Sequence, residues 1–124
     1  MVVFDTSIII DVLRQRKSAL NLLASYSKKE TIAITAISKY EILRGTKERN
    51  LNLVSQLFTQ FVVYDFDDSS IEEAAKAYKK LKDKGKMTNE LDLLIEGIVT
   101  ANNETLITKD RDFLNFENPR IIIL

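Results

Sequence analysis

Val2-Val3-Phe4-Asp5-Thr6-Ser7 is a short apolar run that ends in a carboxylate and two small hydroxyl residues. A helical pattern follows it, up to about Leu13. The run Thr31–Thr35 has the same character and is rich in β-branched residues, which favour strands. Short strands that alternate with helices are typical of a mostly parallel sheet covered on both faces. These stretches therefore predict an α/β protein.

The rest of the chain continues this alternation. Apolar residues at helical spacing predict helices at about 19–26, 38–45, 47–59, 69–84 and 89–102, and short apolar runs predict strands at 61–64, 105–108 and 121–124. Gly85 is expected to stop the helix before it. The sequence thus predicts one domain over residues 1–124, a three-layer α/β/α sandwich around a mostly parallel sheet of roughly five strands.

The composition agrees with a globular domain. Of the 124 residues, 45% are hydrophobic and 29% charged. No apolar run approaches the roughly 20 residues that span a bilayer, and the first residues lack the pattern of a secretion signal. Without such a signal and without cysteine, the expected compartment is the cytoplasm.

The absence of histidine and cysteine restricts the possible chemistry. It excludes a Ser–His–Asp triad, a thiol nucleophile and an ordinary zinc site. Any catalysis must use carboxylates, hydroxyls, lysines or hard cations. Lys+Arg and Asp+Glu number 18 each, so the whole chain has no basic excess of the kind that marks many nucleic-acid-binding proteins.

Carboxylates follow several of the predicted strands. Functional groups of open parallel sheets gather beyond the carboxyl ends of the strands. Asp5 follows the first strand, Glu41 comes shortly after the second, and Asp110 and Asp112 follow the strand at 105–108. Asp92 opens the helix that leads into that strand. We therefore expect these side chains to converge at one edge of the sheet.

Each of these carboxylates also has a purely structural interpretation. Asp5 and Asp112 have the positions of helix or turn caps, worth about 1 kcal/mol each. Ser38 and Glu41 fit a capping box, in which Glu41 reaches back to the Ser38 amide. Asp92 lies in the first turn of a helix, where the dipole favours an anion. For single residues both interpretations stay open.

Taken together, the carboxylates favour a metal site. Two carboxylates about 4 Å apart repel each other by roughly 4 kcal/mol at an effective dielectric constant near 20. Several of them stay ionised in one place only with a cation among them. Oxygen ligands without His or Cys select Mg²⁺ or Mn²⁺. Such ions activate water and stabilise phosphoryl displacement, which is what a histidine-free phosphodiesterase needs.

Four segments in this order resemble the PIN-domain family, and in size and layout the VapC-type toxins of toxin–antitoxin pairs. They are Val3-Phe-Asp5-Thr-Ser-Ile-Ile-Ile-Asp11, Tyr40-Glu41-Ile-Leu-Arg-Gly45, Leu91-Asp92-Leu-Leu-Ile and Thr105-Leu-Ile-Thr-Lys-Asp110-Arg-Asp112-Phe113. The resemblance covers nearly the whole chain. It implies a metal-dependent endoribonuclease, a cognate antitoxin whose tail fills the acidic groove, and a homodimer.

The resemblance also implies roles for individual residues. Asp5 and Asp92 would hold the main metal ion, Asp110 and Asp112 would complete that site or bind a second ion, and Glu41 would orient the attacking water. The small hydroxyl residues Thr6, Ser7 and Thr108 would support the carboxylates, or only satisfy turn backbone.

Four basic residues near the predicted edge are candidates for binding RNA phosphates, namely Arg14, Arg44, Lys109 and Arg111. A solvated helix face explains each of them equally well. The lysines between 76 and 86 are assigned to the wet side of their helix, and Tyr40 and Phe113 to the core.

Two further carboxylates are singled out. Asp11 is interpreted as solvated or as supporting its helix. Glu96 stands where the family usually has a small residue, one helical turn after Asp92, so it would join the site or crowd it.

Three other functions are weighed against the nuclease. A phosphorelay receiver domain shares the length and the βα alternation, but it needs a phospho-accepting Asp near the middle strand, for which only Asp65, Asp67 or Asp68 are available. A haloacid-dehalogenase-type phosphatase needs a second Asp where Ser7 stands. An inactive binding module would keep the fold without turnover.

Overall fold

The computed structural model describes all residues, 1–124, and contains one parallel five-stranded sheet. Its strands are β1 (Val2–Phe4), β2 (Ile32–Thr35), β3 (Val62–Tyr64), β4 (Thr105–Thr108) and β5 (Ile121–Ile123). They lie in the order β3-β2-β1-β4-β5, and every neighbouring pair is parallel. The first strand of the chain is therefore the central one, and its carboxyl end lies between those of β2 and β4.

Helices connect the strands. They are α1 (Thr6–Leu13), α2 (Lys17–Ser27), α3 (Ala36–Arg44), α4 (Leu51–Phe58), α5 (Asp68–Asp83) and α6 (Glu90–Ala101), with short 3-10 helices η1 (Glu48–Asn50) and η2 (Arg111–Phe116). Helix α5 ends at Asp83, and Gly85, just beyond the cap residue, has a φ of +67° that favours glycine, so it stops the helix as the sequence predicts. None of the helices is both long enough and apolar enough to cross a bilayer.

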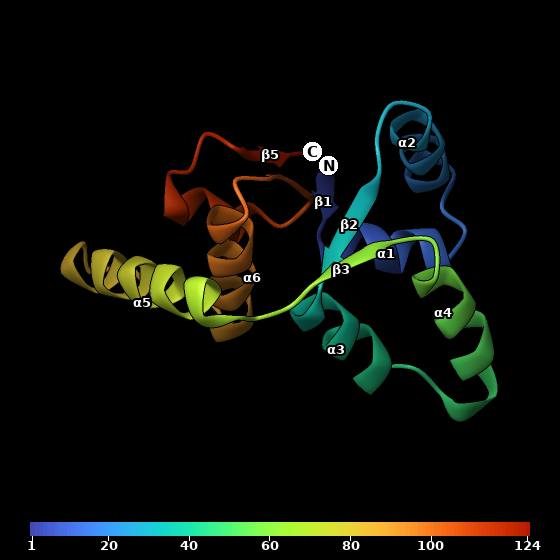
Figure 1. Ribbon diagram of the computed structural model, residues 1–124, viewed down its shortest axis with the longest axis horizontal. Coiled ribbons are helices and arrows are strands. Elements are labelled where there is room, and N and C mark those ends of the chain that lie inside the picture. The colour runs from blue at the N-terminus through green and yellow to red at the C-terminus, as the bar shows by residue number, and fades with distance from the viewer.

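Alternate residues of the strands pack on opposite faces of the sheet, as expected for a three-layer sandwich. Val2 and Phe4 of β1 join a core formed with α1, α3 and α4, whereas Val3 between them joins a second core with α6 and η2. Figure 1 shows α1, α2 and α4 on one side of the sheet and α6 on the other, with α5 packed outside α6. The predicted α/β/α architecture is confirmed.

The structure differs from the expected elements in several details. The helix predicted to begin at Ser38 begins at Ala36, and the one predicted over 47–59 consists of η1 and α4. Phe113 is buried as predicted, but Tyr40 is 55% exposed, so its assignment to the core is wrong. The reason is that Ile42, two residues later, takes the core position on α3.

Helices α5 and α6 cross in close contact. A Cβ atom at Gly97 of α6 would lie only 2.7 Å from the backbone oxygen of Ser70 and 2.8 Å from the Cβ of Ala74. Glycine therefore sets how closely α5 approaches α6. The crossing holds α5 away from the sheet, so that its far end projects from the body of the molecule (Figure 1).

Candidate active site

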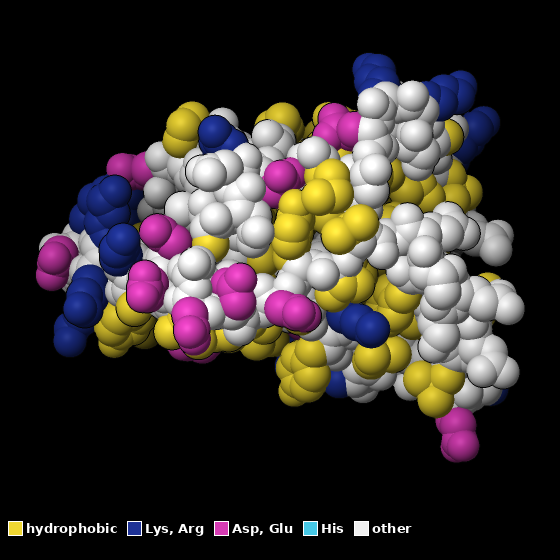
Figure 2. Space-filling model, viewed as in Figure 1, with side chains coloured by type: hydrophobic (Ala, Val, Ile, Leu, Met, Phe, Trp, Pro, Cys, Tyr) yellow, Lys and Arg dark blue, Asp and Glu magenta, His cyan; other side chains and the backbone are white.

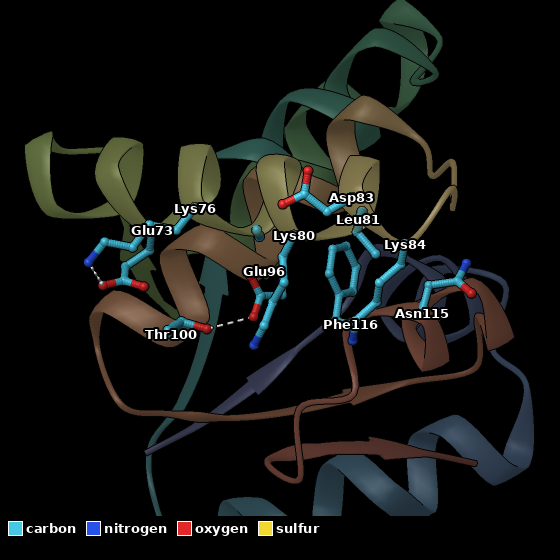
Figure 3. Close-up of a pocket in the computed structure, with 11 residues that line it drawn as sticks. Glu73, Lys76, Lys80, Leu81, Asp83, Lys84, Glu96, Thr100, Asn115 and Phe116 are labelled. Atoms are coloured by element: carbon cyan, nitrogen blue, oxygen red, sulfur yellow. Dashed lines mark hydrogen bonds and ion pairs between the residues drawn. The ribbon is translucent and has the colours of Figure 1, made fainter.

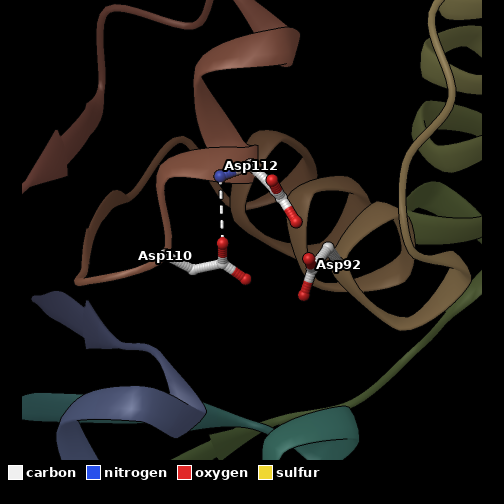
Figure 4. Close-up of side chains that lie close together, drawn as sticks. All are labelled: Asp92, Asp110 and Asp112. Carbon is white, nitrogen blue, oxygen red and sulfur yellow. Dashed lines mark hydrogen bonds between the residues drawn. The ribbon is translucent and has the colours of Figure 1, made fainter.

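Three aspartates meet beyond the carboxyl end of β4. Asp92 is in the first turn of α6, Asp110 follows β4 and Asp112 lies in η2, and one carboxylate oxygen of each lies within 4.8 Å of the others. Figure 4 shows the three side chains directed toward one another from two separate segments. Carboxylates this close repel each other, so the arrangement is typical of a site that holds a cation.

Asp5 lies at the end of the central strand and is only 4% exposed. Its Oδ2 accepts hydrogen bonds from Thr108 Oγ1 (2.7 Å) and Ser7 Oγ (3.1 Å). Burial raises the pKa of Asp5, and these hydroxyl groups offset part of that rise. The side chain does not cap α1, so that structural interpretation is wrong. The hydroxyl groups instead direct the carboxylate to the edge of the sheet.

Thr108 connects Asp5 with the turn that carries Asp110. Its Oγ1 accepts a hydrogen bond from the Asp110 amide (3.0 Å) while it donates to Asp5. Asp110 Oδ1 in turn accepts from the Asp112 amide (2.9 Å), so the cap of η2 is Asp110. The alternative role of Asp112 as the cap is therefore wrong. A single hydroxyl thus sets the positions of carboxylates on two strands.

The convergence of the carboxylates changes the acidity of Asp92. Asn89 supplies the cap of α6, as its side chain accepts from the Leu91 amide (2.8 Å), and Asp92 itself is 8% exposed. Burial and the neighbouring Asp110 raise the pKa of Asp92 to about 7. Asp5 and Glu41 contribute in the same direction. All four carboxylates therefore share one electrostatic environment.

Glu41 reaches this environment from α3. Its Oε1 accepts a hydrogen bond from Thr6 Oγ1 (2.7 Å), and the same Thr6 oxygen lies 2.8 Å from Ser38 Oγ. The predicted capping box is wrong, because Thr35 caps α3 by accepting from the Ser38 amide (3.0 Å). Since β2 runs directly into α3, the last strand residue becomes the cap, and Glu41 is left free to face the other carboxylates.

The basic residues around the carboxylates have different surroundings. Arg14 and Arg111 are exposed, and Arg14 lines the same groove as Glu41, between α1, α3 and α4. Arg44 lies 3.9 Å from Glu41 and packs over the exposed ring of Tyr40. Lys109 is held in an ion pair with Asp11.

Asp11 is buried, so the first of its two sequence interpretations, a solvated residue, is wrong. It pairs with Arg16 (3.3 Å) as well as with Lys109, and it is 7% exposed. Ser7, one helical turn earlier, accepts a hydrogen bond from the Lys109 amide (3.2 Å). Ser7 and Asp11 lie on one face of α1, but this spacing does not by itself indicate a contact with Lys109. Helix α1 is thereby joined to the turn before Asp110.

Glu96 does not belong to the carboxylate cluster. Its Oε1 accepts hydrogen bonds from Thr100 Oγ1 (2.7 Å) and Asn118 Nδ2 (3.3 Å), on the part of α6 that faces α5 and the end of η2. The expectation that Glu96 joins or crowds the site is therefore wrong. The reason is that the loop before β5 places a hydrogen-bond donor at this turn of α6.

The donor set suits a hard divalent cation. All the groups that converge here are carboxylate and hydroxyl oxygens, and neither nitrogen nor sulfur ligands are among them. Oxygen ligands of this kind are typical of Mg²⁺ and Mn²⁺ sites. A cation would also remove the repulsion that raises the pKa of Asp92.

The phosphorelay alternative does not fit this geometry. Asp65, Asp67 and Asp68 follow β3, which is an edge strand, and not the centre of the sheet. Asp67 caps α5 by accepting from the Ser70 amide (2.9 Å). None of the three is part of the carboxylate cluster.

Comparison with known proteins gives a consistent family. Residues 2–118 match the model of the PIN domain. Ribonuclease VapC3 of Methanocaldococcus jannaschii is 36% identical over 97 residues, which cover 77% of this chain and 95% of that protein.

Solved structures share the fold over nearly the whole chain. A chain in the crystal structure of VapBC2 from Rickettsia felis, bound to a DNA fragment from their promoter, aligns with a TM-score of 0.87 and 25% identity. The alignment covers 100% of this chain and 98% of that chain. A chain from a toxin–antitoxin complex of Klebsiella pneumoniae aligns with a TM-score of 0.81 and 21% identity. The alignment covers 98% of this chain and 96% of that chain. The match to the PIN-domain model and the identity with ribonuclease VapC3 show the family, and the shared fold agrees with them. This chain therefore belongs to the PIN-domain family.

Proposed function

We propose that this protein is a metal-dependent endoribonuclease and the toxin of a type II toxin–antitoxin pair. The observation that carries the proposal is the convergence of Asp92, Asp110 and Asp112 within 4.8 Å, with a pKa near 7 for Asp92. Perturbed carboxylates at the carboxyl edge of a parallel sheet mark functional sites. The relationship to a protein named ribonuclease VapC3 supports RNA as the substrate.

In this proposal the carboxylates hold Mg²⁺ or Mn²⁺. Asp92, Asp110 and Asp112 supply oxygen ligands, and Asp5 adds one from the central strand. When bound, the ion supplies an activated water and stabilises the charge of the phosphoryl transition state. Glu41 accepts a hydrogen bond from the attacking water and so orients it. Thr6 holds Glu41 in place by donating to its carboxylate.

The hydroxyl and basic residues have positioning roles in this proposal. Thr108 and Ser7 fix the rotamer of Asp5. Arg14, Arg44 and Arg111 are exposed and contact RNA phosphates, and Arg44 lies within 3.9 Å of Glu41. Lys109 is reassigned from phosphate binding to holding the turn before Asp110, because Asp11 already neutralises its charge.

We also propose that residues 1–124 form a single domain that assembles as a homodimer and binds a cognate antitoxin. Support for the antitoxin comes from the solved VapBC and toxin–antitoxin complexes that share the fold. Support for self-association comes from large apolar side chains exposed on α3 and α5, namely Tyr40, Ile71 and Tyr78. Light scattering of the purified chain tests the homodimer.

The function is tested by cleavage of a panel of defined RNAs, with analysis of the product ends. Asp5→Asn and Asp92→Asn are expected to lower kcat/KM by more than the roughly 10–100-fold typical of groups that only orient metal ligands. Asp68→Asn makes the same chemical change at the exposed start of α5 and should leave cleavage intact. Full activity of Asp92→Asn, or cleavage in excess chelator, would refute the proposed metal site, whereas absence of cleavage by the wild-type chain would favour an inactive binding module.

A further inference from the structure

Glu96 lies at the base of a second pocket, outside the carboxylate cluster. The pocket has a volume of about 500 Å³, within the roughly 300–1,000 Å³ range of small-molecule sites, and lies between α5, α6 and the end of η2. Figure 3 shows Glu96 pointing from α6 toward side chains of α5, with Phe116 beside it. Glu96 itself is 7% exposed, which is uncommon for a carboxylate without an ionic partner.

The hydrogen bonds of Glu96 leave part of its capacity unused. Thr100 and Asn118 both donate to Oε1, whereas Oε2 has no hydrogen-bond donor. A carboxylate offers about four acceptor sites in total. The free oxygen is not among the buried unpaired atoms of the chain, so it is open to the pocket and can accept from an N–H group of a molecule there.

The rim of the pocket carries charges of both signs. Lys76, Lys80 and Lys84 of α5 and the following turn line it, together with Glu73 and Asp83. Lys76 pairs with Glu73, and Lys84 with Glu117, but Lys80 forms no ion pair and extends across the pocket beside Glu96 (Figure 3). Figure 2 shows that basic side chains gather at this end of α5. A ligand for this pocket can thus place a donor group on Glu96 and an anionic group on Lys80.

The position of the pocket relates it to the proposed cleavage site. Asp92 and Glu96 are one turn apart on α6, about 6 Å along the helix axis. Helix η2 runs alongside, with Asp112 near the carboxylate cluster and Phe116 in the pocket. The contact between α6 and η2 therefore has the acidic cluster at one end and the Glu96 pocket at the other.

We propose that the Glu96 pocket binds one amino-bearing base of a single-stranded RNA whose neighbouring phosphate lies at the carboxylate cluster. The amino group donates to Glu96 Oε2, as carboxylates accept from the N4 amino group of cytosine, and Phe116 contacts the base face. Lys80 contacts a second phosphate, on the other side of the same nucleotide. Uracil is disfavoured, because its O4 is an acceptor where cytosine has a donor. This inference rests on the proposed ribonuclease function and extends it to base preference.

The test uses 5′-CMP and 5′-UMP, which differ at this position and contain no phosphodiester bond to cleave. Each is titrated into the ¹⁵N-labelled full chain while NMR follows the Thr100 amide and the Asn118 side-chain NH₂. We expect both signals to shift with CMP, and an affinity for UMP that is weaker by about fivefold to tenfold, as one lost polar contact implies. Absence of shifts, or equal affinity for the two nucleotides, would overturn the proposal and leave a solvent-filled pocket.

Two pairs of variants separate the role of the Glu96 carboxylate from that of the Lys80 ammonium group. Glu96→Gln should abolish the preference for CMP, whereas Glu72→Gln, the same change on the exposed face of α5, should preserve it. Lys80→Ala should weaken both nucleotides equally, and Lys79→Ala, outside the pocket, should weaken neither. An unchanged preference in Glu96→Gln contradicts the assignment. Because Asp92→Asn retains the pocket, CMP binding by that variant is measured independently of RNA cleavage.

Discussion

Asp92 is the side chain whose ionisation the fold opposes most clearly. Its pKa of about 7 lies well above the ordinary value of 3.8 for an aspartate, because the folded state buries it beside Asp110. Between these two values the folded chain binds more protons at this group than the unfolded chain does. Its contribution to stability is therefore fully present below about pH 4 and is lost as the pH rises through 7.

We accordingly predict that Asp92→Asn reduces the loss of stability between pH 5 and pH 8 in the presence of chelator. Urea unfolding at several pH values measures this, with m-values compared to verify that unfolding stays two-state. Asp83→Asn should retain the wild-type slope. A slope that is the same in all three proteins would mean that Asp92 ionises freely in the folded state.

Asp11 has the opposite electrostatic character. A hydrogen bond from Lys109 holds the pKa of Asp11 below its usual value, so its contribution to stability is present at neutral pH and is lost in acid. Lys109 and Arg16 are largely exposed, so each ion pair contributes at most about 1 kcal/mol. The larger consequence is positional, because Lys109 immediately precedes Asp110.

We predict that Asp11→Asn lowers RNA cleavage by about tenfold while it destabilises the chain by at most about 1 kcal/mol. The exchanged pair Asp11→Lys with Lys109→Asp should recover part of the activity, because it restores the contact with reversed charges. A merely structural role would instead lower stability and activity together. Cleavage assays and denaturant unfolding of the same preparations distinguish these outcomes.

Single residues were predictable where the position in the chain implies the position in space. Asp5 and Asp110 directly follow strands, so parallel strands alone bring them to one edge. Asp11 and Glu96 depend on partners about 100 and 22 residues away, Lys109 and Asn118, and no local pattern specifies such contacts. The assignment of Tyr40 to the core was wrong for a related reason. The helical period does not determine which way its side chain points until α3 packs against the sheet.

Among the contacts between secondary-structure elements, the packing of α5 against α6 depends most on a single atom, the Cβ that Gly97 lacks. Adding a Cβ at Gly97 brings it within 3 Å of the Ser70 backbone, which cannot rotate away. We therefore predict that Gly97→Ala destabilises the chain by about 1–3 kcal/mol, the usual cost of overpacking. Gly45→Ala is the matched control, because its nearest neighbours would be 3.7 Å away and its φ of −95° suits any residue.

The control should be neutral or stabilising by up to about 1 kcal/mol, since alanine restricts the unfolded chain. Thermal and denaturant unfolding of both variants provide the comparison. Equal effects at the two glycines would show that α5 moves freely relative to α6. In that case the walls of the Glu96 pocket would not be fixed by this crossing.

The order of the elements followed from the hydrophobic pattern, but their ends did not. Helix α3 begins at Ala36 because Thr35 is both the last residue of β2 and the cap. A capping-box pattern beginning at Ser38 competes with this signal, and the strand pairing of Thr35 with Tyr64 decides between them. Such a decision requires the sheet, which is why boundaries are less predictable than elements.

The molecule as a whole separates its charges although its net charge is zero. Carboxylates gather at the carboxyl edge of the sheet, and lysines gather at the projecting end of α5, as Figure 2 shows for the latter. Overall composition cannot express such a separation, so a balanced charge does not exclude binding of a polyanion. The acidic edge also joins β1, α6 and η2, which are distant in the sequence.

A divalent cation at this edge should therefore stabilise the whole fold rather than one segment. For a ligand at 100 times its Kd the gain is about 2.7 kcal/mol, which corresponds to a rise in Tm on the order of 10 °C for a chain of this size. We predict this rise for wild-type protein with Mn²⁺ at pH 8. For Asp92→Asn we predict a Tm in chelator that is higher than that of the wild-type protein, because one buried charge is gone. The rise in Tm on adding Mn²⁺ should be much smaller than in the wild-type protein. Differential scanning calorimetry measures both quantities, and a variant that loses stability in chelator yet keeps the full response to Mn²⁺ would place the cation elsewhere.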